Sequence, residues 1–183
     1  MTDIFAGSTA RAAAILSEEA VPEIRAGADQ RQLIAYVELL FFAYRDFTGE
    51  ADAVLAEFGF GRAHHRVLHF VNRHPGLRVA DLLDILKITK QSLARVLKQL
   101  VDRGYVLQQA GPEDRRERLL YLTARGRELA EKLAQLQCAR VAAALAEAGD
   151  GSGPEARRFL ASMISKEERS RIEALIFGAG ERP

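Results

Sequence analysis

The sequence is short of the features that mark several large classes of protein. It has one cysteine in 183 residues, so no disulfide can form within the chain, which fits a reducing compartment. No apolar run is long enough to span a membrane. The opening stretch MTDIFAGSTARAAAI lacks a basic segment followed by an apolar one, so we expect no secretory signal. We therefore expect a cytoplasmic protein without a membrane anchor, and its length suffices for a core that needs no structural metal.

The sequence also has little net charge and no recognisable catalytic pattern. No Ser/His/Asp spacing, phosphate-binding loop or pair of carboxylates stands out. Enzymatic activity is therefore the weakest interpretation of this sequence, and we expect no cofactor. The formal net charge is only +1, but residues 60–132 hold 15 Lys+Arg against 8 Asp+Glu, a balance of +7. The rest of the chain has a balance of −6. A basic middle between acidic flanks indicates a unit that binds a polyanion, although chance fluctuation in composition would look the same.

Apolar periodicity predicts a mainly helical chain. A long helix over residues 32–57 is apolar nearly all round and must be covered on more than one face, for which a partner chain could serve. The clearest amphipathic helix is 90–103, with Thr89 as its N-cap and Gly104 just past its end. Before it we predict helices over about 61–74 and 79–86, and after it two extended runs over 105–109 and 118–122. A helix over 124–148, capped by Thr123, is followed by a loop over 149–154. The chain then forms a short helix through Ile164 and a last helix to about Phe177, which a Ser165–Glu168 capping box opens.

Two short helices, a tight connection and a following hairpin describe a winged helix-turn-helix. In such a unit the second helix buries one stripe and presents polar side chains from its first turns to the edges of DNA bases. Here Gln91 can pair with an adenine edge and Arg95 with a guanine, while Lys90 and Lys98 suit phosphates. A basic helix face alone is more often ordinary solvated surface, but the neighbouring helix and hairpin favour DNA binding.

The hairpin tip carries three arginines, Arg115, Arg116 and Arg118. An exposed arginine tip fits the narrow minor groove of A·T-rich DNA. Asp114, two residues before Arg116, is expected to hold a guanidinium in one orientation. Glu113 and Glu117 keep open the alternative of a solvated turn with local charge pairing.

Residues 60–133 resemble the MarR (multiple antibiotic resistance regulator) family of transcription factors. The resemblance rests on the segment ITKQSLARVLKQL at 88–100, on Arg103-Gly104-Tyr105-Val106, on Asp114-Arg115-Arg116, and on Leu122-Thr123 leading into Arg125-Gly126-Arg127. It implies a homodimer of a winged helix-turn-helix protein, with interlocked terminal helices and a pocket between the dimerisation and DNA-binding parts. The partners implied are double-stranded DNA, a second copy of the chain and a small apolar or phenolic effector.

By position, the resemblance makes a set of residues on the second helix the groove readers and phosphate contacts, namely Lys90, Gln91, Ser92, Arg95 and Lys98. We also expect Thr89, at the start of this helix, to contact DNA. Arg116 becomes the wing-tip arginine and Asp114 its orienter. The family often has Ser or Thr where this chain has Gly61 and Arg78, so the local caps differ and Arg78 becomes a candidate phosphate contact. The implied organisation is an N-terminal arm (1–31), a dimerisation helix (32–58), the winged helix-turn-helix (60–123), C-terminal dimerisation helices (124–177) and a tail (178–183).

A few other residues suggest more specific functions. His64, His65 and His69 share a helix, and two of them are four residues apart, but two ligands do not make a metal site, so no metal is expected. Cys138 lies on an apolar helical stripe, and we expect it to be buried and inert rather than a redox sensor. We interpret the aromatic residues from Phe41 to Phe47 as part of the core or of a dimer interface. The alternative is that they line a ligand pocket. A winged helix used only for protein docking remains the rival to DNA binding.

Overall fold

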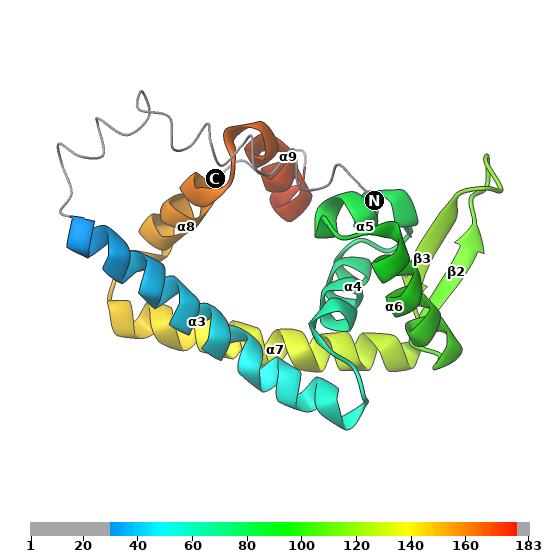
Figure 1. Ribbon diagram of the computed structural model, residues 1–183, viewed down its shortest axis with the longest axis horizontal. Helices are drawn as coiled ribbons and strands as arrows, with labels where there is room; N and C mark the ends of the chain where they lie inside the picture. Colours follow the sequence, from blue (N-terminus) through cyan, green and yellow to red (C-terminus); the bar gives the residue numbers. More distant parts are fainter. Residues whose placement is uncertain (1–29, 179–183) are drawn as a thin grey trace. The chain divides into compact units, whose positions relative to one another are not determined.

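The structure, a computed structural model, describes residues 30–178. The predicted arm lies outside these residues except for its last two positions, as does the predicted tail beyond residue 178. The elements are α3 (Gln30–Glu57), α4 (Arg62–Arg73), β1 (Leu77–Arg78), α5 (Val79–Leu86), α6 (Lys90–Asp102), β2 (Val106–Ala110), β3 (Arg118–Leu122), α7 (Ala124–Ala148), α8 (Ser152–Met163) and α9 (Lys166–Phe177) (Figure 1). The predicted fold class, a mainly helical winged helix-turn-helix with a hairpin wing and flanking helices, is confirmed.

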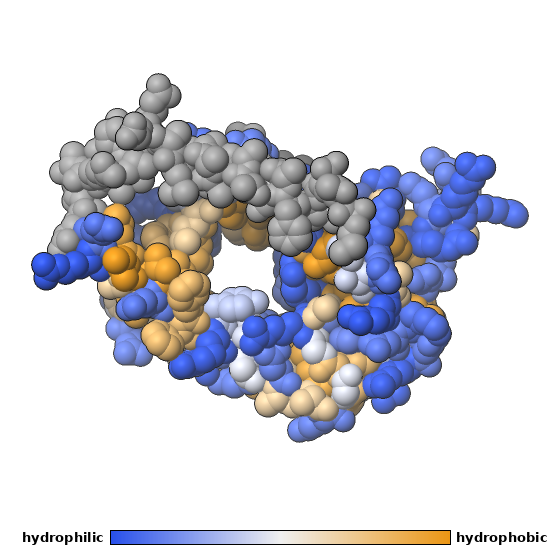
Figure 2. Space-filling model, viewed as in Figure 1, coloured by the Kyte–Doolittle hydropathy of each residue, from blue (hydrophilic) through white to orange (hydrophobic). Residues whose placement is uncertain are grey.

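The chain divides into two compact units, and the division falls within α3 between Glu50 and Ala51. The first unit is described only from Gln30 to Glu50, all of it helix. Many of its apolar side chains are exposed, for example Phe41 at 70% and Leu39 at 62% (Figure 2). The prediction that this helix needs a cover on several faces therefore stands, because the part of the chain described here leaves those faces open.

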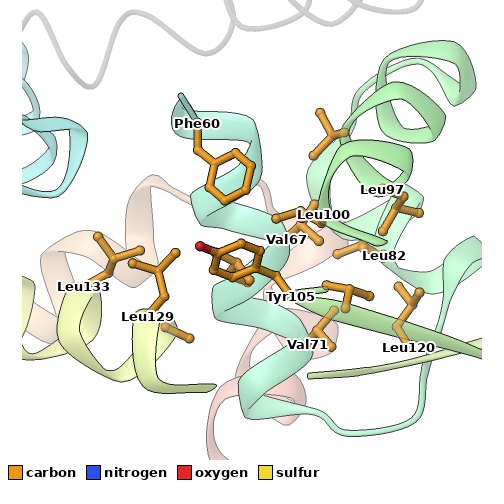
Figure 3. Packing of buried hydrophobic residues seen from close by; sticks show 14 of the residues in the cluster. Phe60, Val67, Val71, Leu82, Leu97, Leu100, Tyr105, Leu120, Leu129 and Leu133 are labelled. Carbon is orange, nitrogen blue, oxygen red and sulfur yellow. The ribbon is translucent and has the colours of Figure 1, made fainter. Parts of the chain in front are cut away.

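The core lies in the second unit and joins every element from the end of α3 to the first turns of α7. Tyr105 is at its centre, 1% exposed, with its ring packed edge-on against Phe60 at a centroid distance of 5.1 Å (Figure 3). Each fully buried leucine side chain contributes about 1.5–3 kcal/mol relative to exposure. The most deeply buried residues around Tyr105 are Leu55, Val67, Leu68, Val71, Leu82, Leu93, Leu100, Val106, Leu120 and Leu133.

The sheet has three antiparallel strands in the order β1-β3-β2. The first predicted run was one residue early, because Tyr105 belongs to the core and the strand starts at Val106. The reason is the turn at Gly104, whose φ of +70° lets the Tyr105 amide donate back to the Leu100 carbonyl at 2.8 Å. Strand β1, which pairs Leu77 with Leu120, was missed because two residues show no alternation.

The helix ends were predicted with mixed success. Thr89 and Thr123 cap α6 and α7 as expected, accepting hydrogen bonds from the amides of Ser92 and Gly126 at 3.1 and 3.0 Å. The predicted loop over 149–154 is wrong in its second half, since α8 begins at Ser152. Pro154 is accommodated in its first turn, where its missing amide costs no helical bond.

The predicted capping box at the start of α9 is also wrong. Ser165 makes no side-chain capping bond, and the Glu168 carboxylate turns to Lys87 and Arg171 instead. Within residues 30–178, no helix combines the length and the apolar character needed to cross a membrane.

Candidate nucleic-acid interface

The first turn of α6 is fixed by its own cap. The Thr89 hydroxyl accepts from the Ser92 amide and donates to Ser92 Oγ at 2.9 Å. Both residues were predicted DNA contacts, and the structure gives Thr89 a role in starting the helix. Because the cap sets the helix start, it also sets which side chains of α6 turn outward, on the side opposite the buried stripe of Leu93, Val96 and Leu97.

The outward face of α6 presents hydrogen-bonding and cationic groups. Lys90, Gln91 and Arg95 are exposed, and no described residue forms a hydrogen bond or ion pair with them. Lys98 lies 2.6 Å from Asp102 Oδ2 in an exposed pair whose two side chains are 74% and 56% exposed. An exposed pair of this kind is weak in water, so the Lys98 ammonium can exchange the carboxylate for another anion at little cost.

The wing tip is a turn organised by Asp114. Its carboxylate accepts from the Arg116 backbone amide at 2.8 Å, and its carbonyl accepts from the Glu117 amide at 3.0 Å. Asp114 was expected to hold a guanidinium, but it shapes the turn through the backbone instead. Arg115 and Arg116 are exposed on this turn, whereas the Arg118 guanidinium folds back onto the carbonyls of Arg115 and Glu117.

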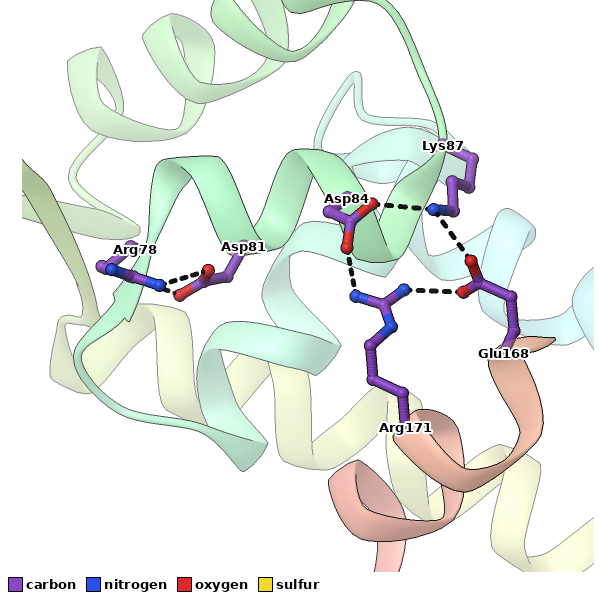
Figure 4. Close-up of polar contacts among 6 residues, drawn as sticks. All are labelled: Arg78, Asp81, Asp84, Lys87, Glu168 and Arg171. Carbon is purple, nitrogen blue, oxygen red and sulfur yellow. Dashed lines mark hydrogen bonds and ion pairs between the residues drawn. The ribbon is translucent and has the colours of Figure 1, made fainter. Parts of the chain in front are cut away.

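Arg78, the candidate phosphate contact, is engaged within the protein. Its guanidinium binds both carboxylate oxygens of Asp81, at 2.7 and 2.8 Å, and reaches Glu117 Oε1 at 3.1 Å (Figure 4 shows the Asp81 pair). These bonds, those to Asp81 first, raise the pKa of Arg78 above its already high ordinary value. Arg78 therefore ties the start of α5 to the base of the wing, a role that sequence reasoning missed because Glu117 is distant in the chain.

A groove of about 650 Å³ lies between α5, α6 and the wing strands, all within the second unit. Its floor is apolar and includes Leu83, Leu93 and Leu97. Lys90, Lys98 and Arg118 contribute to its lining. No sequence pattern points to this groove, because its lining comes from four elements.

The histidines of α4 serve packing and capping. His64 stacks on Phe60, accepts from the Gly61 amide at 3.1 Å and lies 2.5 Å from Gln99 Oε1, so its ring satisfies the amide of the N-cap residue, while Gly61 itself makes no side-chain cap. His65 is 8% exposed, and burial lowers the pKa of both His65 and His69. His74 is the C-cap residue of α4. Residues 30–178 contain no group of three or more potential metal ligands.

The prediction that Cys138 is buried is wrong, because its side chain is exposed; that it is inert stays a prediction. The stripe that it shares on α7 enters the core only as far as Leu133, and Val141 further along is 46% exposed. The apolar pattern was read correctly, but the described chain leaves Cys138 and Val141 exposed.

Comparison with known proteins agrees with this geometry. The model of the MarR family matches residues 58–117. The HTH-type transcriptional regulator PetP of Rhodobacter capsulatus is 43% identical over 144 residues, which are 79% of this chain and 87% of that protein. The crystal structure of MarR has the same fold, with a TM-score of 0.58 at 20% identity over 81% of this chain and 95% of that one.

A further solved structure shows a relative with a ligand. The MarR family protein Rv2887 of Mycobacterium tuberculosis, in complex with p-aminosalicylic acid, has a TM-score of 0.51 at 28% identity over 75% of this chain and all of that one. Fold and relatives together define a winged helix-turn-helix transcriptional regulator. The chain belongs to the MarR family.

Proposed function

We propose that the protein binds a pseudo-palindromic operator as a homodimer, reading bases with α6 and the minor groove with the wing. The observation that carries the proposal is the row of exposed groups on α6, Lys90, Gln91 and Arg95, that the described chain leaves unpaired. A cationic row held on a capped, rigid helix is ready for DNA without breaking internal bonds. We also propose a cytoplasmic location, which is consistent with membership of a family of transcriptional regulators.

The other predicted contact residues divide by how the fold engages them. Lys98, Arg115 and Arg116 remain proposed DNA contacts, since their outer groups are exposed or only weakly paired. Ser92 also remains a proposed contact, although it is half-buried and its hydroxyl accepts a hydrogen bond from Thr89. Thr89, Arg78, Asp114 and Arg118 take part in bonds that shape α6 and the wing. We propose that these four act mainly by holding the contact surface in place.

Two features support a small-molecule effector. The groove beside α6 has a volume typical of small-ligand sites, and an apolar floor beside lysines suits an aromatic carboxylate or phenol. A 28% identical relative binds p-aminosalicylic acid. A ligand in this groove would compete with DNA for Lys90 and Lys98.

The test is a salt titration of binding to the selected operator and to a random duplex, for three variants. Arg95→Ala should cost about 1–3 kcal/mol on the operator and little on random DNA, because a lost base contact removes sequence reading. Lys98→Ala should weaken both duplexes and lower the salt slope by about one per subunit. Arg116→Ala should cost most on operators with A·T-rich flanks, where the minor groove is narrow. Repeating the titration with p-aminosalicylate tests the effector.

Equal losses on operator and random DNA for Arg95→Ala and Lys98→Ala would show that Arg95 does not read bases. If none of the three variants changes binding, α6 is not the DNA-contacting surface. In that case the winged helix is better explained as a protein-docking module.

A further inference from the structure

Four charged side chains form a closed ring between α9 and the helix-turn-helix (Figure 4). Lys87 Nζ lies 2.7 Å from Asp84 Oδ1 and 3.3 Å from Glu168 Oε1. Arg171 Nη2 lies 2.8 Å from Glu168 Oε2, and its Nη1 closes the ring on Asp84. Each acid therefore contacts both bases, and hydrogen bonding to the bases lowers the pKa of Asp84 and of Glu168. We call these four residues the charge ring.

The contacts that join α9 to the helix-turn-helix are mainly polar. No side chain of α9 is fully buried within the described chain, and Ile172, Leu175 and Phe177 are only half-buried, so apolar packing alone does not fix the position of the helix. The charge ring holds its first turns, and Arg73 of α4 donates to the Ile176 carbonyl at 3.1 Å near its end. The position of α9 against α5 thus depends on charged groups, which salt and single substitutions can weaken.

Lys87 combines this role with a strained backbone. It ends α5 with φ 51° and ψ 43°, and it is the only non-glycine residue with a positive φ among residues 30–178. Glycine is the usual residue at a left-handed helix end, and a side chain there carries a conformational cost. Glycine would have no ammonium to place between Asp84 and Glu168. The strained backbone and the two ion pairs are independent observations, and both indicate that a lysine is specifically used at position 87.

The charge ring sits where it can affect the spacing of the reading helices. Residues 87–89 connect α5 directly to α6, and both helices bury leucines in one core, so they move together. The helix before α9, α8, exposes Phe159, Leu160 and Met163, an apolar face open to a partner chain. An ion-pair ring between these two parts links the partner-facing helices to the reading helix.

We propose that Asp84, Lys87, Glu168 and Arg171 are positioning residues, which hold the helix-turn-helix at a fixed place relative to the C-terminal helices and so set the operator spacing that the dimer prefers. This inference rests on the proposed function, since spacing has meaning only for a dimer on DNA. The charge ring itself can be tested without DNA.

The experiment uses Glu168→Gln and Lys87→Gly in the full-length chain, with Arg158→Gln as the matched control. Arg158 forms an exposed ion pair 3.5 Å from Glu155, but both residues lie within α8. Spin labels on Glu113→Cys, in a Cys138→Ser background, report the distance between the two wings of the dimer. Binding is measured on operators whose half-sites are moved by one base pair in either direction.

The charge-ring variants should broaden the distance distribution and lower discrimination between the native and shifted spacings by about two- to fivefold, the size expected for exposed ion pairs. Their affinity for random duplex should not change. Lys87→Gly should do this without loss of thermal stability, because it relieves the strained backbone; this separates positioning from folding. Arg158→Gln should match the parent.

Unchanged distances and unchanged spacing preference in both charge-ring variants would overturn the proposal. So would an equal effect of Arg158→Gln, because the loss would then follow from any change of surface charge. If the parent binds no duplex, the proposed function fails and so does the spacing role. The distance distributions would then show whether the charge ring still holds the two parts together.

Discussion

Among single residues, Gly126 meets the strictest steric requirement. A Cβ at this position would lie 2.0 Å from the carbonyl oxygen of Tyr105, which is backbone at the centre of the core. Gly126→Ala must therefore push α7 away from the start of β2, and we expect it to destabilise the protein by about 2–4 kcal/mol. Urea unfolding at fixed protein concentration measures this change.

Gly49→Ala is the matched control for Gly126→Ala. Its added Cβ meets nothing within 4 Å, and the position lies inside helix α3, so we expect a small gain of about 0.5–1 kcal/mol. A loss for Gly126→Ala no larger than 0.5 kcal/mol, roughly the noise of a surface change, would show that α7 is not held this closely to Tyr105.

How far the sequence predicts a residue's role depends on where its partners lie. Thr89 and Thr123 were assigned correctly because a cap bonds to an amide three residues away. The capping role of Glu168 was wrong because its partner Lys87 comes from another element. The bond of Arg78 to Glu117 was not predicted for the same reason. The outward row of α6 was predictable because exposure on a helix follows from periodicity alone.

Helix α4 should make stability depend on pH. Burial lowers the pKa of His65, of His69 and of His74, with neighbouring histidine or arginine charges acting in the same direction. The folded protein therefore holds these rings neutral, while the unfolded chain takes up protons below its ordinary pKa of about 6.5. Stability should be fully present above that pH and decrease as the pH falls from about 7 to 5.

Thermal unfolding midpoints between pH 5 and 8 test this prediction, with His65→Gln as the comparison. Removing one buried ring should flatten the dependence between about pH 5 and 7, since fewer protons are taken up on unfolding. The lowered pKa values of Asp84 and Glu168 affect stability only at more acidic pH, so these two carboxylates do not change the dependence in this range. Parallel curves for parent and variant would contradict a buried, neutral His65.

At the scale of elements, the helices were predicted from their strong apolar periodicity, whereas short elements were missed. The two-residue strand β1 is held by pairing with β3, which no local pattern reveals. The start of α8 was missed because Gly153 and Pro154 are typical of loops, yet a first helical turn tolerates both.

The whole molecule should be a homodimer. Apolar side chains on α3 and α8, such as Phe41, Leu39 and Leu160, are more than half exposed, and an isolated chain would leave them in water. With a chain mass of 20.2 kDa, sedimentation equilibrium at micromolar concentration should show a species of about 40 kDa. A species of chain mass alone would refute the dimer.

Paired substitutions locate the interface. Phe41→Glu should dissociate the dimer, because a carboxylate would replace an apolar contact. Leu107→Glu, on the wing at 49% exposure, should leave it intact. If both variants sediment like the parent, the interface does not use this part of α3.

Helix α7 gives the molecule a long lever arm. It is 25 residues long, but only its first turns, as far as Leu133, are embedded in the core. The remaining stretch, residues 134–148, reaches about 22 Å beyond at the rise of an α-helix. A tilt of about 10° at the embedded end would swing the far end through about 4 Å. Conversely, a shift of about 1 Å imposed near Ala148 would rotate the wing and α6 by only about 3°, so small displacements at the far end of α7 make fine adjustment of the reading surface possible.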